Sequence, residues 1–271
     1  MSGIHPLAVV DASARIGDGV TIGPFAVIGP DVTIGDRTEI GPHVQIHGPT
    51  VIGSENRVYP SVCLGMDPQD LKFANEPVRL EVGHRNTIRE FTTFHRGTGK
   101  GGGLTTVGDD NLFMVYSHVA HDCHVGSDTI FGPGATLGGH VVVEDFAQIS
   151  AYSGVHQFCR VGRYAFIGGY SVVTLDALPF AKTVGNRARV YGLNTIGLVR
   201  RGFTPEVVSK LKRAYRYLLT SRLAPSKALQ TIDAAPELAC ADVAYLVDFI
   251  RSSSRGVTLR RPNKRADDAG E

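Results

Sequence analysis

Five histidines are concentrated in the middle of the sequence, and their side chains could do chemistry at neutral pH. They are His118, His121, His124, His140 and His156. An imidazole that titrates near neutrality can remove a proton as a general base, or it can bind a metal ion as a neutral ligand. Asp122 follows His121 directly. The sequence therefore offers acid–base chemistry or a metal site, provided that the fold brings these residues together.

A six-residue repeat predicts the elements that would position the histidines. Its first position is aliphatic or phenylalanine in 26 units, which run from Ile4 to Leu64, from Val82 to Phe94 and from Val107 to Val173. The fifth position is small or of modest size, and glycine is frequent at the second. A period of six matches neither an α-helix nor an ordinary hairpin sheet. It predicts a solenoid whose short strands turn a corner once per unit.

Three units form one coil of 18 residues, and this period brings distant histidines to one wall of the solenoid. Steps of 18 residues from position 121 reach positions 139 and 157. His121, the Gly139-His140 pair and the His156-Gln157 pair therefore fall on one wall in successive coils. A single solenoid histidine is more often solvated or satisfies a turn. His124 lies out of phase and keeps that interpretation, while His118, which neighbours His121 at a corner, stays open.

Two segments interrupt the repeat, at residues 66–81 and 97–106. Insertions in solenoids project as loops on one face, often the binding face. The second insertion contains a GKGGG run, which could be mistaken for a phosphate-binding P-loop. It lacks the spacing of that motif and any following helix, so we give it no such role.

The repeat fades after Val173, and the helical signals begin further along the chain. Thr204, Pro205 and Glu206 are typical of an N-cap, a first-turn proline and an acidic first turn. Later helices are marked by Pro225, Pro236 and an apolar group of Leu238, Val243, Leu246, Val247 and Ile250. We predict a mainly β protein, with a β-helix over residues 1–190, a small C-terminal α-helical domain over residues 191–271, and a polar, frayed tail from residue 255.

The composition excludes several classes of protein. The formal net charge of +2 gives no global basic field for binding nucleic acid. The four cysteines form no CxxC pair and are expected to be small core residues. The N-terminus lacks a charged segment followed by an apolar run, and no apolar stretch is long enough for a membrane span. We therefore expect a cytoplasmic protein with no integral membrane segment.

The repeat has the pattern [LIV]-G-x-x-[STAV]-x and resembles the hexapeptide-repeat acyltransferase superfamily. That resemblance implies a left-handed parallel β-helix, although parallel crossovers are generally right-handed. It also implies a homotrimer with active sites between subunits. The general rules of chain topology would not have given the left hand.

More specific motifs lie around the histidines, in the order QDLKFANEP, IREFTTFHRGT, AHDCHVG, GGHV, VHQFCRVG and GLNTIGLVRRGF. To about Arg251 the chain closely resembles the UDP-N-acetylglucosamine O-acyltransferase family, which catalyses the first step of lipid A biosynthesis. This implies transfer of a 3-hydroxyacyl chain from the phosphopantetheine of acyl carrier protein to the 3-hydroxyl of UDP-N-acetylglucosamine, with no further cofactor and no bound metal. The related N-acyltransferase is expected to carry an additional domain before its repeats, whereas here they begin at Ile4.

The resemblance also implies residue roles. His121 would be the general base, Asp122 would orient or charge it, and the backbone N–H of Gly139 would face the oxyanion, with no covalent intermediate. The implied substrate-binding residues are Gln69, Asp70, Lys72, His118, His140, His156, Gln157, Gly169, Asn194, Arg200 and Arg201. Without the motif, Arg200 and Arg201 would be interpreted as a solvated pair at a helix entry.

Two further positions and one basic strip bear on the choice of substrates. Ile196 stands where some members of the family carry a carboxylate that meets the nucleotide, and isoleucine cannot make that contact. Gly169 matches a position that limits the depth of the acyl channel, so the resemblance implies a long chain of ~12 to 14 carbons, as the open site of a glycine allows. Gly169→Met would then shorten the preferred chain. A basic strip could dock an acidic carrier protein or could be a solvated helix face; it comprises Lys210, Lys212, Arg213, Arg216, Arg222 and Lys227.

Two other functions remain open at this stage. Related β-helix carbonic anhydrases bind zinc through three histidines across a subunit boundary, so a metal-dependent hydratase is one alternative. A catalytically silent scaffold of the same fold is the other. A hydratase has no evident need for the QDLK loop or the helical tail. Loss of stoichiometric zinc on His121→Ala would favour the hydratase, and a scaffold would tolerate the same substitution.

Overall fold

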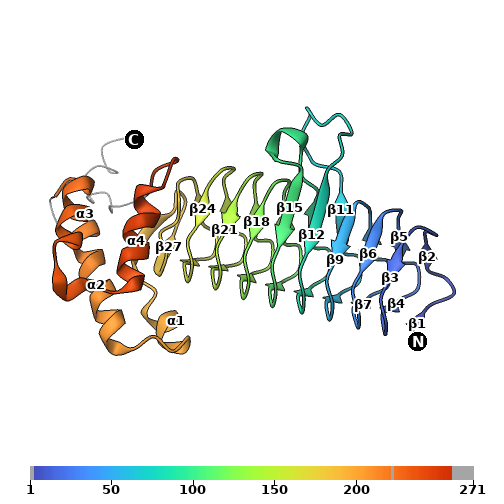
Figure 1. The fold of residues 1–271 in the computed structure, drawn as a ribbon, viewed down its shortest axis with the longest axis horizontal. Coiled ribbons are helices and arrows are strands. Elements are labelled where there is room, and N and C mark those ends of the chain that lie inside the picture. The colour runs from blue at the N-terminus through green and yellow to red at the C-terminus, as the bar shows by residue number, and fades with distance from the viewer. Residues whose placement is uncertain (1–2, 221–222, 258–271) are drawn as a thin grey trace.

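The computed structural model describes residues 3–220 and 223–257, which form a long β-prism followed by a group of helices (Figure 1). The prism is a left-handed parallel β-helix, as predicted. Its strands are mostly two residues long and end on the aliphatic first position of each unit. Each strand pairs in parallel with the strand one coil later, so that Ile4 faces Ile22 and Phe113 faces Phe131. The 18-residue coil therefore sets the register.

Three flat sheets form the sides of the prism, and the chain visits them in the order A, B, C. Sheet A has eleven strands: β1 (Gly3–Ile4), β4 (Thr21–Ile22), β7 (Glu39–Ile40), β10 (Arg57–Val58), β13 (Thr87–Ile88), β16 (Leu112–Phe113), β19 (Ile130–Phe131), β22 (Gln148–Ile149), β25 (Phe166–Ile167), β27 (Ala181–Val184) and β28 (Arg189–Leu193). Sheet B has nine: β2 (Val9–Val10), β5 (Val27–Ile28), β8 (Gln45–Ile46), β11 (Cys63–Met66), β14 (Thr93–His95), β17 (His118–Val119), β20 (Thr136–Leu137), β23 (Gly154–Val155) and β26 (Val172–Val173). Sheet C has eight: β3 (Arg15–Ile16), β6 (Val32–Ile34), β9 (Thr50–Ile52), β12 (Arg79–Val82), β15 (Leu104–Val107), β18 (His124–Val125), β21 (Val142–Val143) and β24 (Arg160–Val161).

The axis of the prism is filled by the first and fifth positions of the repeat. From Ile22 onward the aliphatic first positions are buried, whereas Ile4 is 41% exposed because no earlier coil covers it. Along the axis, Phe94 meets Phe113 edge-on with ring centroids 4.7 Å apart, and Phe113 stacks on Phe131 at 4.6 Å. Such continuous apolar burial is the main source of stability in a solenoid.

Three corners join the sheets, and they differ in character. We call the turns that lead from sheet A to B, from B to C and from C to A the A–B, B–C and C–A corners. Both insertions leave from the B–C corner, one between β11 and β12 and the other between β14 and β15, and they project together from the prism (Figure 1). The second contains a short 3-10 helix, η1 (Gly99–Gly101). The interruptions of the repeat are thus loops on one edge, as the solenoid interpretation predicts.

The chain leaves the prism through a hairpin that the sequence reasoning did not foresee. β27 continues sheet A in parallel with β25, and β28 then pairs antiparallel with β27. The boundary expected between residues 190 and 191 falls inside β28. A second buried cluster joins Leu178, Phe180 and Val190 to the apolar faces of the helices, so the last coil shares a core with the helical part.

The helices are α1 (Thr195–Arg200), α2 (Pro205–Leu219), α3 (Pro225–Asp233), η2 (Pro236–Leu238) and α4 (Ala241–Arg251). Thr204 caps α2, and its Oγ1 accepts from the Val207 N–H at 3.3 Å, which agrees with the predicted start. α1 was not predicted, since six residues carry little periodic signal. No helix within the described ranges combines the length and apolar content needed to cross a bilayer. Most of the tail that we expected to be frayed, residues 258–271, lies outside the described residues.

Candidate active site

A cleft of about 790 Å³ lies along the B–C corner, between the prism and the two insertions. His121 and His140 come from successive coils, and Gln157 comes from the coil after them. The first insertion adds three polar side chains. The lining residues are Gln69, Asp70, Leu71, Lys72, Thr98, Lys100, Gly101, His121, His140, Gln157 and Phe158. Five of these, namely Leu71, Thr98, Lys100, Gly101 and Phe158, were missed by the sequence reasoning.

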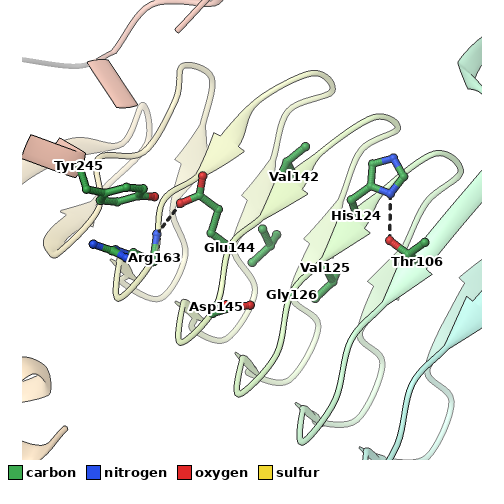
Figure 2. A pocket seen from close by; sticks show the side chains of 10 residues that line it. Thr106, His124, Val125, Gly126, Val142, Glu144, Asp145, Arg163 and Tyr245 are labelled. Carbon is green, nitrogen blue, oxygen red and sulfur yellow. Dashed lines mark hydrogen bonds between the residues drawn. The ribbon is translucent and has the colours of Figure 1, made fainter. Parts of the chain in front are cut away.

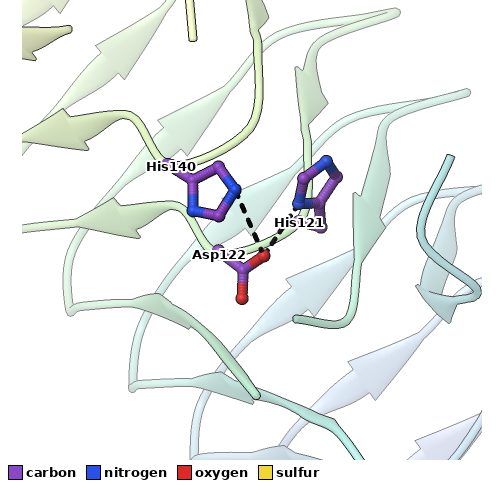
Figure 3. Close-up of side chains that lie close together, drawn as sticks. All are labelled: His121, Asp122 and His140. Atoms are coloured by element: carbon purple, nitrogen blue, oxygen red, sulfur yellow. Dashed lines mark hydrogen bonds and ion pairs between the residues drawn. The ribbon is translucent and has the colours of Figure 1, made fainter. Parts of the chain in front are cut away.

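His121 and Asp122 form a hydrogen-bonded pair at the wall of the cleft (Figure 3). His121 Nδ1 lies 2.8 Å from Oδ2 of Asp122. Asp122 is only 2% exposed. Asp122 sits at the left-handed corner position of its coil, with φ of 57°. This conformation is tolerated by Asp better than by most residues, and it turns the carboxylate under the ring. Because a carboxylate only accepts hydrogen bonds, Nδ1 must carry the proton and Nε2 is left as the base.

His140 occupies the corner position of the next coil, and its ring stands edge-on to His121 with the centroids 5.1 Å apart. Its Nε2 is 3.8 Å from Asp122 Oδ2 (Figure 3). Burial lowers the pKa of His140, because desolvation of the charged ring outweighs the Asp122 carboxylate, which raises the pKa. Phe158 stacks on the His140 ring, with the centroids 4.4 Å apart. His140 is therefore held as a neutral side chain next to the pair.

Gly139 lies directly over the His121 ring. A Cβ atom at this position would come within 2.7 Å of His121 Nε2 and 2.5 Å of Cε1, so only glycine leaves room for the imidazole. The same position of the repeat is proline in Pro24, Pro42 and Pro133, which shows that the solenoid does not need its N–H for the sheet. The Gly139 N–H is thus free to meet a negative oxygen beside the ring.

Two of the predicted histidines lie near the corner but do not line the cleft. His118 faces outward on β17, with Nδ1 2.7 Å from Thr93 Oγ1 and its ring 4.9 Å from that of His95. Burial first, and then the nearby His121, lower its pKa. His156 is exposed, and its Nδ1 lies 2.9 Å from Nη2 of Arg255. The phase argument placed the His156 backbone correctly at the B–C corner, but Gln157 supplies the side chain that reaches the cleft.

The remaining predicted residues lie on other sides of the prism. Gly169 is at the A–B corner, next to the exposed Tyr170. Asn194 and Arg200 line a separate hollow over sheet A, where Asn194 caps α1 through Gly197 N–H at 3.3 Å. Arg201 lies at the C–A corner, 3.4 Å from Asp128. Within one chain these residues cannot reach the His121 cleft, because sheet A is the side of the prism opposite the B–C corner.

A second hollow lies on sheet C where the prism meets α4 (Figure 2). His124 is at its edge, and its Nδ1 is 2.9 Å from Thr106 Oγ1. Arg163 and Glu144 also border it, but Arg163 pairs with Asp242 at 3.0 Å and stacks on Tyr245 at 3.8 Å, while Glu144 pairs with a neighbouring arginine. These groups join the prism to the helices. No pair comparable to His121 and Asp122 is present there.

A parallel β-helix of hexapeptide units, with a histidine–aspartate pair in a corner cleft, defines a hexapeptide-repeat transferase. The family described as bacterial transferase hexapeptide (six repeats) matches residues 13–48 and 104–139, and the one described as UDP-N-acetylglucosamine O-acyltransferase, domain 2, matches residues 176–258. The chain belongs to the UDP-N-acetylglucosamine O-acyltransferase family, so the resemblance inferred from the motifs is confirmed.

Individual relatives support this assignment along nearly the whole chain. The acyl-[acyl-carrier-protein]–UDP-N-acetylglucosamine O-acyltransferase of Alkalilimnicola ehrlichii is 53% identical over 257 residues, which cover 95% of this chain and 99% of the relative. The solved UDP-N-acetylglucosamine acyltransferase of Francisella novicida is 41% identical, with a TM-score of 0.90 over 96% of this chain and 95% of that one. The solved enzyme of Campylobacter jejuni is 34% identical, with a TM-score of 0.90 over 95% of this chain and 100% of that one.

Proposed function

We propose that this chain transfers a 3-hydroxyacyl group from acyl carrier protein to the 3-hydroxyl of UDP-N-acetylglucosamine, the first step of lipid A biosynthesis. The observation that carries the proposal is the His121–Asp122 pair, with Nδ1 bound at 2.8 Å to a buried carboxylate and the ring lining the cleft. The names of the relatives agree with this substrate pair. No further cofactor is required, since the acyl group arrives on the phosphopantetheine of its carrier.

The proposed reaction proceeds without a covalent enzyme intermediate. His121 Nε2 takes the proton of the sugar hydroxyl while that oxygen attacks the thioester carbonyl. The negative charge that develops on the carbonyl oxygen is met by the Gly139 N–H. As the C–S bond breaks, the pantetheine sulfur leaves and takes the proton back from the imidazolium. Asp122 stabilises the imidazolium throughout, as a buried carboxylate does for the histidine of a catalytic triad.

The first insertion is proposed to hold the substrates over His121. Gln69, Asp70 and Lys72 line the cleft opposite the histidines. The Lys72 ammonium is suited to a phosphate of the nucleotide or of the pantetheine arm, and Asp70 is suited to sugar hydroxyls. His140 and Gln157 complete the prism side of the cleft. No metal is proposed: His121, Asp122 and His140 lie close enough to hold one, but Asp122 Oδ2 already accepts from His121 and Thr98.

We further propose that the working enzyme is a homotrimer. Asn194, Arg200 and Gly169 lie on the far sides of the prism from His121, so only another copy of the chain could bring them to the same substrate. The A–B corner also carries a row of exposed aromatic residues, which supports an interface between subunits at this corner: Phe25, Phe91, Tyr116, Tyr152 and Tyr170. By contrast, the C–A corner carries ion pairs such as Arg37–Glu55 and Arg85–Asp110.

Docking of the acidic carrier is proposed for α2 and the start of α3. Lys210 is bound to Glu206 at 2.7 Å and Arg213 to Glu237 at 2.7 Å, so both are partly neutralised. Lys212, Arg216 and Lys227 are exposed and form no ion pair within the described ranges, while Arg222 of the predicted strip lies outside them.

A cytoplasmic location is proposed as well, since all four cysteines are free thiols.

The decisive experiment offers the purified, EDTA-treated protein UDP-N-acetylglucosamine with a series of 3-hydroxyacyl carrier proteins and identifies the product by mass. We expect an O-acylated sugar nucleotide, and a fall in kcat/KM of roughly 10²- to 10⁴-fold for His121→Ala. His124→Ala is the matched control, since His124 lies on sheet C outside the cleft, and should retain full activity. Zinc measured before the EDTA treatment at one ion per chain, and absent from His121→Ala, would support the hydratase instead. An unaffected His121→Ala enzyme would refute the assigned base.

A further inference from the structure

The second insertion encloses the carboxylate of Asp122. Oδ1 of Asp122 accepts from the Thr98 backbone N–H at 2.9 Å, and Oδ2 accepts from the Thr98 hydroxyl at 2.7 Å. One residue therefore binds both carboxylate oxygens and prevents the carboxylate from rotating. Thr98 is itself only 4% exposed, so water does not compete for these two bonds. The GKGGG run, which has no P-loop role, is part of this enclosure.

The direction of the Thr98 hydroxyl bond is fixed by its neighbours. Thr98 Oγ1 caps η1 and accepts from the Gly101 N–H at 3.2 Å, which leaves its own hydrogen for Asp122. Glycine is required around the carboxylate, because a Cβ at Gly101 would lie 2.1 Å from Asp122 Cγ, and one at Gly97 would lie 2.8 Å from Oδ1. The glycines of this loop therefore allow the backbone to approach a buried charge.

The turn is also tied to the first insertion. Glu76 Oε1 accepts from the Gly99 N–H at 3.0 Å, and Oε2 accepts from the Ala74 N–H at 2.8 Å. Glu76 therefore joins the loop that carries Asp70 and Lys72 to the turn that carries Thr98. These bonds fix Thr98 from one side while Asp122 fixes it from the other.

We propose that Thr98 is a positioning residue for the general base, acting through Asp122 in a chain of hydrogen bonds from Thr98 to Asp122 to His121. The proposal rests on the base role assigned to His121 above. With both oxygens held by Thr98, Oδ2 is presented to His121 Nδ1 at 2.8 Å in one orientation. Without the hydroxyl, the carboxylate loses one of two charge-assisted bonds to Thr98 and can turn away from the ring. The imidazolium formed during catalysis is then less stabilised.

Thr98→Val tests the proposal, because valine keeps the shape of threonine and removes only the hydroxyl bond. We expect kcat to fall roughly ten- to hundredfold, the effect of losing one hydrogen bond to a charged group, with the KM for UDP-N-acetylglucosamine changed less than about twofold. The acidic limb of the pH–rate profile should move to lower pH. Thr98→Ser keeps both donors and should recover most of kcat. Thr106→Val is the matched control, since it removes a threonine hydroxyl that contacts a histidine on sheet C, away from Asp122 (Figure 2).

The outcomes separate this inference from the proposed function. If Thr98→Val keeps the wild-type kcat and pH–rate profile while His121→Ala is inactive, Thr98 has no positioning role and the function stands. If His121→Ala is fully active, the function itself fails. A loss of activity that Thr98→Ser does not recover also overturns the inference, because it would reflect packing alone. Thr98→Val could lower the midpoint of thermal unfolding. In that case the kcat and the pH–rate profile of Thr98→Ala, which adds no second methyl group, decide by the same criteria.

Discussion

His95 provides a quantitative test of the structure that does not depend on catalysis. It ends β14 next to the cleft, is 5% exposed, and its Nδ1 is buried without a hydrogen-bond partner among the described residues. Burial, reinforced by the nearby His118 and His121, lowers the pKa of His95 from 6.5 to about 4. The folded protein therefore holds His95 neutral at a pH at which the unfolded chain takes up a proton.

The sign and size of the effect follow from this difference. A depressed folded pKa makes the His95 contribution complete above pH 6.5 and progressively lost as the pH falls from 6.5 towards 4. At about 1.36 kcal/mol per pKa unit, the full loss is about 3 kcal/mol, of which about 2 kcal/mol has been lost at pH ~5. The free energy of unfolding should thus decrease between pH ~7.5 and ~5 partly because of this one ring.

The assay compares urea unfolding at these two pH values, followed by circular dichroism at one fixed protein concentration, for the wild type and His95→Phe. Phenylalanine keeps an aromatic contact with His118 and cannot be protonated, so the decrease should be smaller by about 2 kcal/mol in the variant. His124→Phe removes an exposed histidine and should keep the wild-type decrease. An equal decrease in wild type and His95→Phe would refute the inferred burial of a neutral imidazole.

Two further predictions concern the prism. Asn86 is fully buried, and its backbone N–H and Nδ2 donate to Asn56 Oδ1 at 2.9 and 3.0 Å. Asn86→Ala should lower the free energy of unfolding, measured in urea, by at least about 2 kcal/mol, because it leaves buried polar groups unpaired. A decrease below about 0.5 kcal/mol would contradict this role. Tyr152 and Tyr170 are 61% and 73% exposed. Replacing both by arginine should convert the proposed trimer to monomers in sedimentation, while Arg37→Glu at the C–A corner should leave the sedimenting mass of the assembly unchanged. A trimer that survives the double change would place the interface elsewhere.

The period of the sequence was sufficient to predict the solenoid and the part of the site that depends on register, whereas the left hand came from the family resemblance. Every coil repeats the same corner geometry, so a step of 18 residues puts His121 beneath Gly139 without further information. The same reasoning could have found the buried asparagines, because Asn56, Asn86 and Asn111 occupy the fifth position of the unit at one corner in successive coils. Asparagine departs from the small residues of the [STAV] pattern at the fifth position, and such a departure indicates polar groups that must satisfy one another.

Period alone could not predict what the side chains at a corner do, since it places backbones and leaves their partners open. His156 lies in the expected coil, yet its ring meets Arg255, which arrives from the end of α4 about a hundred residues later. Thr98 lies outside the repeat. Its hydrogen bonds to Asp122 depend on the close approach of the loop backbone to the carboxylate, which Gly97 and Gly101 allow. Insertions are free of the repeat and can bend toward a corner, so in this solenoid the repeat supplies the base and an irregular loop fixes its orientation. The unpredicted part of the site is thus concentrated in the residues outside the repeat.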